Sequence, residues 1–272
     1  MQFTSMILSN SEVSSGYWRM RMTAPPGFAA AEAGQFVMVR VNGAIDPLLR
    51  RPFGIFDIGV YTPQHAGAAP QPYFEILYRV VGKGTAMLST LHETDVLDIL
   101  GPLGHGFTAG DSGEEKLVVG GGVGLAPLYY LARKLVTGSP VRLFAGGKTR
   151  DDVLCITEFE RLGVECYTAT EDGSLGECGL VTEALVRRLD SLEGKATIYA
   201  CGPHGMLNAV ANIAAARNIP CQVSLEGYMA CGVGACLGCV AQGRAHSDET
   251  PEYRCVCTEG PVFEAGELKW RE

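Results

Sequence analysis

Five of the ten cysteines lie close together near the end of this 272-residue chain. Three of them, Cys231, Cys236 and Cys239, have the spacing C-x4-C-x2-C. With this spacing a single loop supplies three thiolates to a [2Fe–2S] cluster of the plant ferredoxin type. Glycines between the cysteines permit positive φ and let backbone N–H groups approach the sulfides. The sequence therefore predicts an iron–sulfur site here.

The residues leave the fourth cluster ligand open between Cys255 and Cys257. A zinc site is the alternative, because Cys236 and Cys239 could join those two cysteines in a tetrahedral four-thiolate arrangement. The additional Cys231 and the glycines favour the cluster. The surrounding tail is short and has no long periodic segment, so a metal centre would be needed to hold it together.

A second group of residues has the pattern of a nucleotide site. Residues 117–127 read as a strand, a glycine turn and the start of a helix, with Gly121, Gly122 and Gly124 in the turn. Glycines permit a tight turn, and the N-terminus of a helix attracts a pyrophosphate, although the pattern is not a strict G-x-G-x-x-G. This segment is therefore a candidate NAD-binding turn.

Cys201, Gly202 and Pro203 follow a later strand at its expected carboxyl end, where open α/β sheets bind their ligands. Cys201 would either flank the nicotinamide or be a buried small residue. Glu171 and Asp172 lie in another loop that contains no arginine. If that loop meets the adenosine ribose, its acidic residues favour NAD over NADP.

Two segments upstream could bind a flavin pyrophosphate. Residues 50–55 read RRPFGI, and residues 77–85 read LYRVVGKGT. An arginine gives paired charge-assisted hydrogen bonds to phosphate, and small residues expose backbone N–H groups. Each segment alone is weak evidence, but together, upstream of a nucleotide motif, they favour a flavin.

The elements that must position these residues change along the chain. Residues 1–105 contain short β-rich runs and predict a small antiparallel β-barrel for the flavin. Residues 106–222 alternate strands and helices and predict a parallel sheet with helices on both faces. Residues 223–272 form a small cysteine-rich third domain. The expected strands are 36–41, 73–81, 95–100, 116–119, 141–145, 164–169 and 196–200, and the expected helices are 126–136, 152–162, 181–189 and 205–217.

The composition excludes several classes of protein. The chain is 47% hydrophobic and 19% charged, which provides enough apolar material for buried cores. A net charge of −8 argues against a nucleic-acid binder. No apolar run reaches about 18 residues, so no membrane span is expected. The N-terminus lacks the pattern of a secretory signal, and we expect a reduced, cytoplasmic protein with a cysteine metal site.

These motifs resemble a known family. The segments RRPFGIF, YRVVGKGT, GPLGHGF, VVGGGVGLAPL, GGKTRDD, TEDGS and YACGPHGM occur in the order typical of the ferredoxin reductase superfamily. The tail, with SLEGYMACGVGACLGCV and YRCVCTEGPVF, resembles the electron-transfer subunit of type B dihydroorotate dehydrogenase. The resemblance covers essentially the whole chain.

The resemblance implies positions for the cofactors. The implied FAD contacts are Arg51, Pro52, Phe53, Gly54, Leu77, Tyr78, Arg79, Gly84 and Thr85. The implied cluster ligands are Cys231, Cys236, Cys239 and Cys257, the last because it directly precedes TEGPVF. Gly54 stands where serine or threonine is usual, so this chain lacks a hydroxyl that could hydrogen-bond flavin N5. Gly205 replaces a usual proline, which puts the local turn in doubt.

The resemblance also implies a partner, an FMN-containing catalytic subunit that oxidises dihydroorotate to orotate, with two copies of each chain. Electrons would pass from that FMN through the [2Fe–2S] cluster and FAD to NAD⁺, and this chain would supply no catalytic acid or base. One alternative is a flavin and iron–sulfur reductase of the same architecture that serves another partner, such as a sulfur- or ferredoxin-linked complex. Another is a non-enzymatic nucleotide-binding regulator with a structural zinc.

Overall fold

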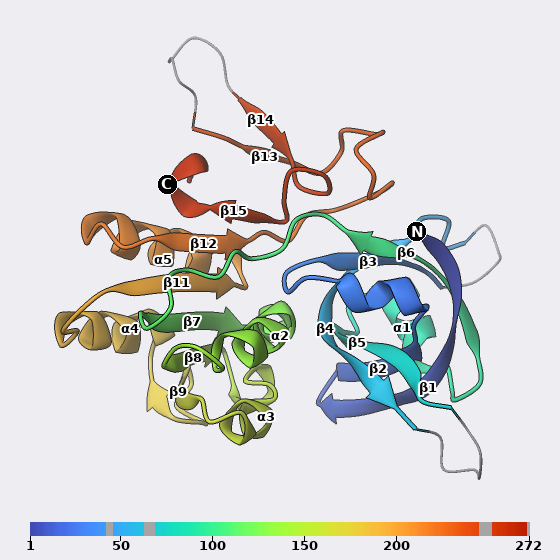
Figure 1. Cartoon of the computed structure of the whole chain (residues 1–272), viewed down its shortest axis with the longest axis horizontal. Helices are drawn as coiled ribbons and strands as arrows, with labels where there is room; N and C mark the ends of the chain where they lie inside the picture. Colours follow the sequence, from blue (N-terminus) through green and yellow to red (C-terminus); the bar gives the residue numbers. More distant parts are fainter. Residues whose placement is uncertain (42–45, 63–68, 245–251, 271–272) are drawn as a thin grey trace.

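The computed structural model describes residues 1–41, 46–62, 69–244 and 252–270 (Figure 1). The first part of the chain forms a closed barrel of antiparallel strands in the order β1-β2-β5-β4-β3-β6, which confirms the predicted barrel. Its elements are β1 (Gln2–Ser14), β2 (Tyr17–Thr23), η1 (Pro26–Ala30), β3 (Phe36–Arg40), β4 (Arg51–Tyr61), β5 (Gln71–Arg79), α1 (Lys83–Ser89) and β6 (Val96–Leu103). The sequence patterns predicted β3, β5 and β6, although β6 continues through Gly101 and Pro102, where we expected it to stop.

The second part is the predicted α/β domain. Its sheet has the order β10-β9-β8-β7-β11-β12-β15, and all neighbouring pairs except β12 with β15 are parallel. The strands are β7 (Glu115–Gly121), β8 (Val141–Gly147), β9 (Glu165–Thr170), β10 (Glu177–Cys178), β11 (Ala196–Cys201) and β12 (Cys221–Ser224). The helices are η2 (Gly122–Gly124), α2 (Leu125–Leu135), η3 (Arg150–Asp152), α3 (Ile156–Arg161), α4 (Val181–Asp190) and α5 (His204–Ala216). Helices α2 and α3 contribute to one buried core and α4 and α5 to the other, so both faces of the sheet are covered.

The helix predicted at 152–162 is wrong at its beginning. The Thr149 hydroxyl accepts the Asp151 N–H at 3.3 Å, which ends the loop in the short 3-10 turn η3. Cys155 then adopts the left-handed conformation, with φ of 59°, and α3 begins only after it. A left-handed residue cannot continue a right-handed helix, so the helical pattern overestimated the length.

The tail completes the sheet of the second domain. β15 (Val262–Glu264) pairs antiparallel with β12, which itself crosses the predicted boundary between residues 222 and 223. β13 (Val240–Gln242) and β14 (Tyr253–Cys255) form a separate pair, and η4 (Ala265–Glu267) follows β15. One buried core joins Phe263 of the tail to Met38 of the barrel and Val119 of β7. The tail therefore packs against both other domains, above them in Figure 1.

The barrel and the α/β domain meet along helix α2. Phe56 and Tyr129 stack with their ring centroids 4.6 Å apart, and the Tyr130 hydroxyl donates to the Ala31 carbonyl oxygen at 2.9 Å. The Arg133 guanidinium lies 3.0 Å from Asp57 Oδ1, an oxygen that has no hydrogen-bond donor among the described residues. Burial raises the pKa of Asp57 to about 6, although Arg133 opposes this shift. The junction therefore combines apolar packing with one costly buried carboxylate.

None of the helices in the described ranges is both long and apolar enough to cross a membrane.

Candidate cofactor sites

A cavity of about 580 Å³ opens where the barrel meets the carboxyl ends of β7, β11 and β12. Its barrel wall contains most of the predicted flavin contacts. They are Arg51, Pro52, Phe53, Gly54, Leu77, Tyr78, Arg79 and Thr85. β4 and β5 are antiparallel neighbours, so the beginning of β4 and the end of β5 lie side by side. Two segments that are far apart in the sequence thus form one wall.

Gly84 is the one predicted flavin residue that does not line this cavity. A Cβ at this position would lie 2.7 Å from Arg51 Nε, so the glycine leaves room for the guanidinium. The adjacent turn is held by Thr85, whose Oγ1 accepts the N–H groups of Val81 at 2.9 Å and Gly82 at 3.2 Å. The beginning of α1 is therefore fixed beside the arginine.

The opposite wall contains Gly121, Gly122, Cys201 and Pro203. β7 and β11 pair in parallel, so the turns that follow them lie next to each other. A Cβ on Gly124 would lie 2.3 Å from the Cys201 carbonyl oxygen. Gly124 lies outside the cavity lining, and it allows the two turns to touch.

Gly202 has the same role on the other side of this contact. It has φ of 154°, and a Cβ there would lie 3.0 Å from the Gly121 nitrogen. Burial raises the pKa of the Cys201 thiol to about 12, so this side chain is protonated at neutral pH. Cys201 is thus both a buried small residue and part of the cavity wall. Glu171 and Asp172 do not line this cavity.

The sequence patterns missed a third wall. Ser224, the last residue of β12, and residues 225–229 after it line the cavity, together with Tyr17 and Pro261. Desolvation raises the pKa of the Glu226 carboxyl within this segment. A second cavity of about 780 Å³ shares residues 225–228 with the first and extends beneath the tail to Trp270. β12 has only four residues and no usable period, but the carboxyl-end rule would have found this wall had the strand been recognised.

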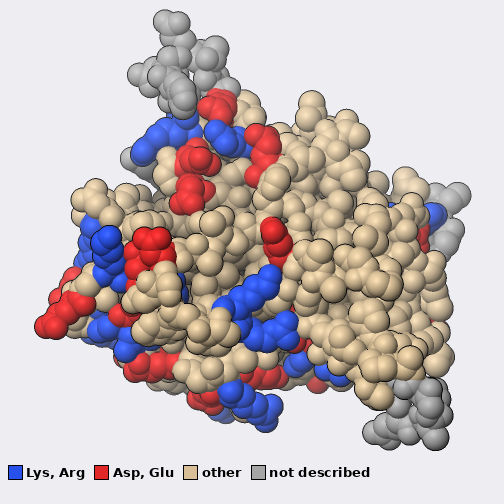
Figure 2. All heavy atoms as spheres, in the orientation of Figure 1, with Lys and Arg blue, Asp and Glu red and all other residues tan. Residues whose placement is uncertain are grey.

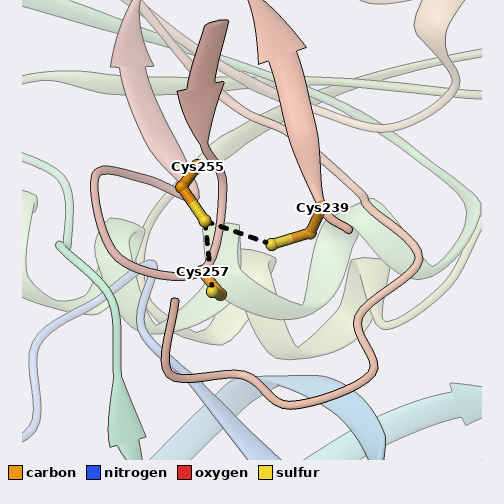
Figure 3. A group of neighbouring side chains, drawn as sticks. All are labelled: Cys239, Cys255 and Cys257. Atoms are coloured by element: carbon orange, nitrogen blue, oxygen red, sulfur yellow. Dashed lines mark hydrogen bonds between the residues drawn. The ribbon is translucent and has the colours of Figure 1, made fainter. Parts of the chain in front are cut away.

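Three buried thiols converge in the tail (Figure 3). Cys239, Cys255 and Cys257 have their sulfur atoms within 4.8 Å of one another. Cys255 Sγ lies 3.7 Å from Cys239 Sγ and 3.6 Å from Cys257 Sγ. Burial, together with the neighbouring Cys239 and Cys255, raises the pKa of the Cys257 thiol to about 12. Metal binding at this group therefore releases a proton.

The other two cysteines form a separate set. Cys231 is half-buried, Cys236 is exposed, and their thiols interact with each other. The Val233 N–H donates to Cys231 Sγ at 3.5 Å and, with the help of Cys236, lowers the pKa of the Cys231 thiol to about 6. This set sits on the loop that begins beside the first cavity.

The loop is shaped to surround a metal group. Gly232, Gly234 and Leu237 all have positive φ, of 73°, 78° and 53°. The Gly234 N–H donates to Cys257 Sγ at 3.1 Å, which joins the two sets through the backbone. A [2Fe–2S] cluster takes two thiolates on each of two irons, whereas one zinc ion needs all four on itself. Thiols divided into two sets therefore fit the cluster better than zinc.

Comparison with known families identifies two segments of the chain. Residues 226–269 match the iron–sulfur cluster binding domain of dihydroorotate dehydrogenase B. Residues 118–212 match the oxidoreductase NAD-binding domain. The first segment contains all five clustered cysteines, and the second contains both glycine turns.

The chain is also similar over nearly its full length to curated proteins and a solved structure. It is 36% identical over 269 residues to the dihydroorotate dehydrogenase B (NAD⁺) electron transfer subunit of Desulforamulus reducens, covering 98% of each chain. It is 44% identical over 240 residues to the Bacillus caldolyticus protein of the same name, covering 87% of this chain and 86% of that one. A solved NADH-dependent reduced ferredoxin-NADP oxidoreductase superposes with a TM-score of 0.81 at 26% identity, covering 98% of this chain and 90% of that one.

Proposed function

The chain belongs to the family of electron-transfer subunits of dihydroorotate dehydrogenase B, and on this premise we propose that it passes electrons through a [2Fe–2S] cluster and FAD to NAD⁺. When bound, FAD would exchange single electrons with the cluster and a hydride with NAD. One observation carries the proposal. Gly227 lines the cavity, and a Cβ on it would lie only 3.8 Å from Cys239 Cβ, so the two cofactor sites are immediate neighbours.

The barrel wall of the cavity would hold FAD. We assign to this wall the pyrophosphate clamp of Arg51, with the N–H groups at the beginning of α1 around Thr85. Tyr78 donates to Asn10 Oδ1 at 3.0 Å and has Phe53 edge-on at 5.8 Å, so its ring is fixed. Rigid aromatic and proline surfaces suit a flat isoalloxazine ring. The proposed FAD-binding residues are Arg51, Pro52, Phe53, Gly54, Leu77, Tyr78, Arg79, Gly84 and Thr85.

The opposite wall would hold the nicotinamide nucleotide. Its proposed residues are Gly121, Gly122, Gly124, Cys201, Gly202 and Pro203. If the loop that carries Glu171 and Asp172 meets the adenosine ribose, these acidic residues would favour a free ribose hydroxyl, and therefore NAD over NADP. The proposed cluster ligands are Cys231, Cys236, Cys239 and Cys257. The three proposed domains are 1–105 for FAD, 106–222 for NAD and 223–272 for the cluster.

Residues 225–239, between β12 and β13, carry Cys231, Cys236 and Cys239 and are called the thiol loop. The surface around the thiol loop would dock the partner subunit that the names of the relatives imply. Large apolar side chains are exposed there, with 49% of Val233, 68% of Leu237, 46% of Val240 and 99% of Tyr228 accessible. On the face in Figure 2, acidic and basic side chains gather over the α/β domain and on the tail, while much of the barrel shows uncharged atoms. Apolar side chains gathered on one exposed loop indicate a protein contact. We propose an FMN-containing dihydroorotate dehydrogenase subunit as the occupant, with two copies of each chain, in the cytoplasm.

A second candidate function is supported by the similarity to the solved ferredoxin-NADP oxidoreductase. On that alternative, the same cofactors would serve a ferredoxin or another redox protein. The identity to the dihydroorotate dehydrogenase B subunits, 36% and 44%, exceeds the 26% to that structure, so the first candidate is favoured.

Anaerobic absorption spectroscopy tests the proposal. We expect flavin bands and a broad red absorbance in the purified chain, and both should bleach when NADH is added. NADPH should bleach them more slowly. Reconstitution with the catalytic subunit should then give dihydroorotate-dependent reduction of NAD⁺. A colourless, zinc-containing chain would rule out electron transfer, and a coloured chain that exchanges electrons only with ferredoxin would support the second candidate.

A further inference from the structure

The tail contains five clustered cysteines, one more than a four-ligand site requires. The proposed ligands leave Cys255 over, yet its sulfur lies between those of Cys239 and Cys257 (Figure 3). Cys255 is buried, as are both of its thiol neighbours. This position raises the question of whether Cys255 can also bind the metal.

The backbone holds Cys255 there without help from a metal. β13 and β14 pair so that Cys255 faces Val240, the residue after Cys239. The Val256 N–H donates to the Cys239 carbonyl oxygen at 2.7 Å. The Cys255 N–H donates to Glu259 Oε2 at 2.5 Å, and the Glu259 N–H returns a bond to the Cys255 carbonyl at 2.8 Å. A strand ladder and a tight turn thus fix Cys255 beside Cys239.

The sulfur separations match those of ligands on a shared metal. With metal–sulfur bonds of about 2.3 Å, two thiolates on one tetrahedral ion lie roughly 3.8 Å apart. Cys239 and Cys255 are 3.7 Å apart, and Cys255 and Cys257 are 3.6 Å apart. Cys255 is therefore placed to share an iron with Cys239, where Cys257 is the proposed fourth ligand.

One contact distinguishes the two candidate ligands. Cys257 accepts the Gly234 N–H from the loop that carries the other thiols. A backbone N–H stabilises the thiolate and tunes the metal group. The Cys255 sulfur is instead hydrogen-bonded within its own turn, by the Thr258 side chain and the Cys257 backbone. Cys257 is thus the favoured ligand, and Cys255 is the next available one.

We propose that Cys255 is a reserve ligand that can replace Cys257 on the iron shared with Cys239. In the exchange, the Cys255 thiol releases its proton to solvent and forms the sulfur–iron bond. The sulfur–iron bond of Cys257 breaks, and its thiolate takes up a proton. One thiolate replaces another, so no electron moves and the charge of the site is unchanged. The inference rests on the proposed [2Fe–2S] site.

Three variants test it: Cys257→Ala, Cys255→Ala and the double variant. Alanine supplies no oxygen that could replace the sulfur. Iron and acid-labile sulfide are measured per bound FAD in anaerobically purified protein, and electron paramagnetic resonance spectra are recorded after reduction. We expect each single variant to keep at least half of the wild-type iron, and the double variant to keep less than a tenth. Cys257→Ala should also show shifted g values.

Each result has one meaning. If either single variant loses iron as fully as the double variant, the reserve role is wrong, and a wild-type protein with cluster and FAD leaves the proposed function standing. A wild-type protein without iron overturns both. Cys166→Ala, on β9, controls for the loss of a thiol elsewhere, and bound FAD reports folding. If the alanine variants do not fold, Cys257→Val with and without Cys255→Val repeats the comparison, because valine is closer to cysteine in size and also supplies no ligand atom.

Discussion

The nucleotide cavity and the thiol loop lie side by side but are held in place by different means. The cavity walls are ends of strands in a closed barrel and a parallel sheet, and the two domains are joined by contacts such as the Phe56–Tyr129 stack. Between β12 and β13, by contrast, the described residues form no helix or strand. The loop is shaped by positive φ angles and by the hydrogen bond from Gly234 to Cys257.

The two sites therefore obtain their free energy in different ways. The cavity exists because two hydrophobic cores have folded, so its nucleotide binds to a preformed surface. Most residues of the loop are exposed or only partly buried, and at the proposed cluster its thiolates would share a metal. At such a site the free energy of metal binding is also the local free energy of folding.

The largest effect is expected from Cys239→Ala. Cys239 belongs to the site whether Cys255 or Cys257 is the fourth ligand. The variant should lose more than nine-tenths of its iron, because a structural metal site contributes on the order of 10 kcal/mol. The region after β12 should then become sensitive to protease, while FAD binding falls less than about threefold. Iron analysis and mass spectrometry of the proteolytic fragments measure both effects.

Cys221→Ala is the matched control, because Cys221 is a buried cysteine of β12 outside the thiol group. It should keep its iron and its protease resistance. If Cys239→Ala lost FAD as completely as iron, the two sites would share one folding unit, and the cavity would not be preformed independently of the thiol loop.

Asp57 should give the next largest effect, at the junction beside the cavity. Burial raises the pKa of Asp57 from 3.8 to about 6, so the native chain holds this proton more tightly than the unfolded chain. The free energy of unfolding is therefore highest below about pH 4 and falls as the pH rises to about 6. This difference between the unfolded and folded pKa of Asp57 corresponds to roughly 3 kcal/mol. Asp57→Asn should flatten this part of the curve, measured as denaturation midpoints between pH 4 and 7.

Asp98→Asn provides a control of opposite sign. Partial burial acts to raise the pKa of Asp98, but hydrogen bonds from Arg50 and Gln2 leave it lowered. Its contribution to stability is present above the unfolded pKa and is lost only at lower pH, so the curve above pH 4 should keep its slope. If the free energy of unfolding of Asp57→Asn changed with pH as it does in the wild type, the pKa of Asp57 would not be raised at the junction.

The same contrast explains what the sequence could predict. Short β-rich runs were sufficient to predict the barrel, and the alternation of strands with helices was sufficient to predict the α/β domain. Cys155 was not recognisable as a left-handed residue, so the helix before Leu162 was predicted too long. β12 and β15, of four and three residues, carry no period, and the wall that they support was missed.

The thiol loop shows a different limit. The C-x4-C-x2-C spacing predicted a cluster, but spacing alone does not reveal how the thiols divide in space. The position of Cys255 beside Cys239 depends on the ladder between β13 and β14, two strands of three residues each. Pairing between segments that short is decided by tertiary contacts, which a local pattern does not contain.

Arg51→Ala should weaken the binding of FAD to the cavity and leave the thiol loop unchanged. A charge-assisted hydrogen bond contributes about 1.5–3 kcal/mol, so the Kd for FAD should rise roughly 10- to 100-fold. Iron content should stay within a few per cent of the wild type. The Kd of Arg51→Lys for FAD should lie between those of the wild type and Arg51→Ala, because lysine keeps the charge but loses the paired hydrogen bonds of the guanidinium. Arg50→Ala is the neighbouring control, since Arg50 pairs with Asp98 at 2.6 Å and should leave the affinity for FAD unchanged.

The smallest effect concerns Gly54, where the resemblance predicts a hydroxyl side chain. A Cβ there would lie 3.5 Å from Pro127 Cδ, an ordinary contact, so serine fits the preformed wall. One hydrogen bond to flavin N5 contributes about 1 kcal/mol, and hydride transfer from NADH in Gly54→Ser should change about fivefold in stopped-flow reduction. Gly54→Ala fills the same space without a hydroxyl and should match the wild type. If both variants slowed equally, the space beside Pro127 rather than the missing hydroxyl would control hydride transfer.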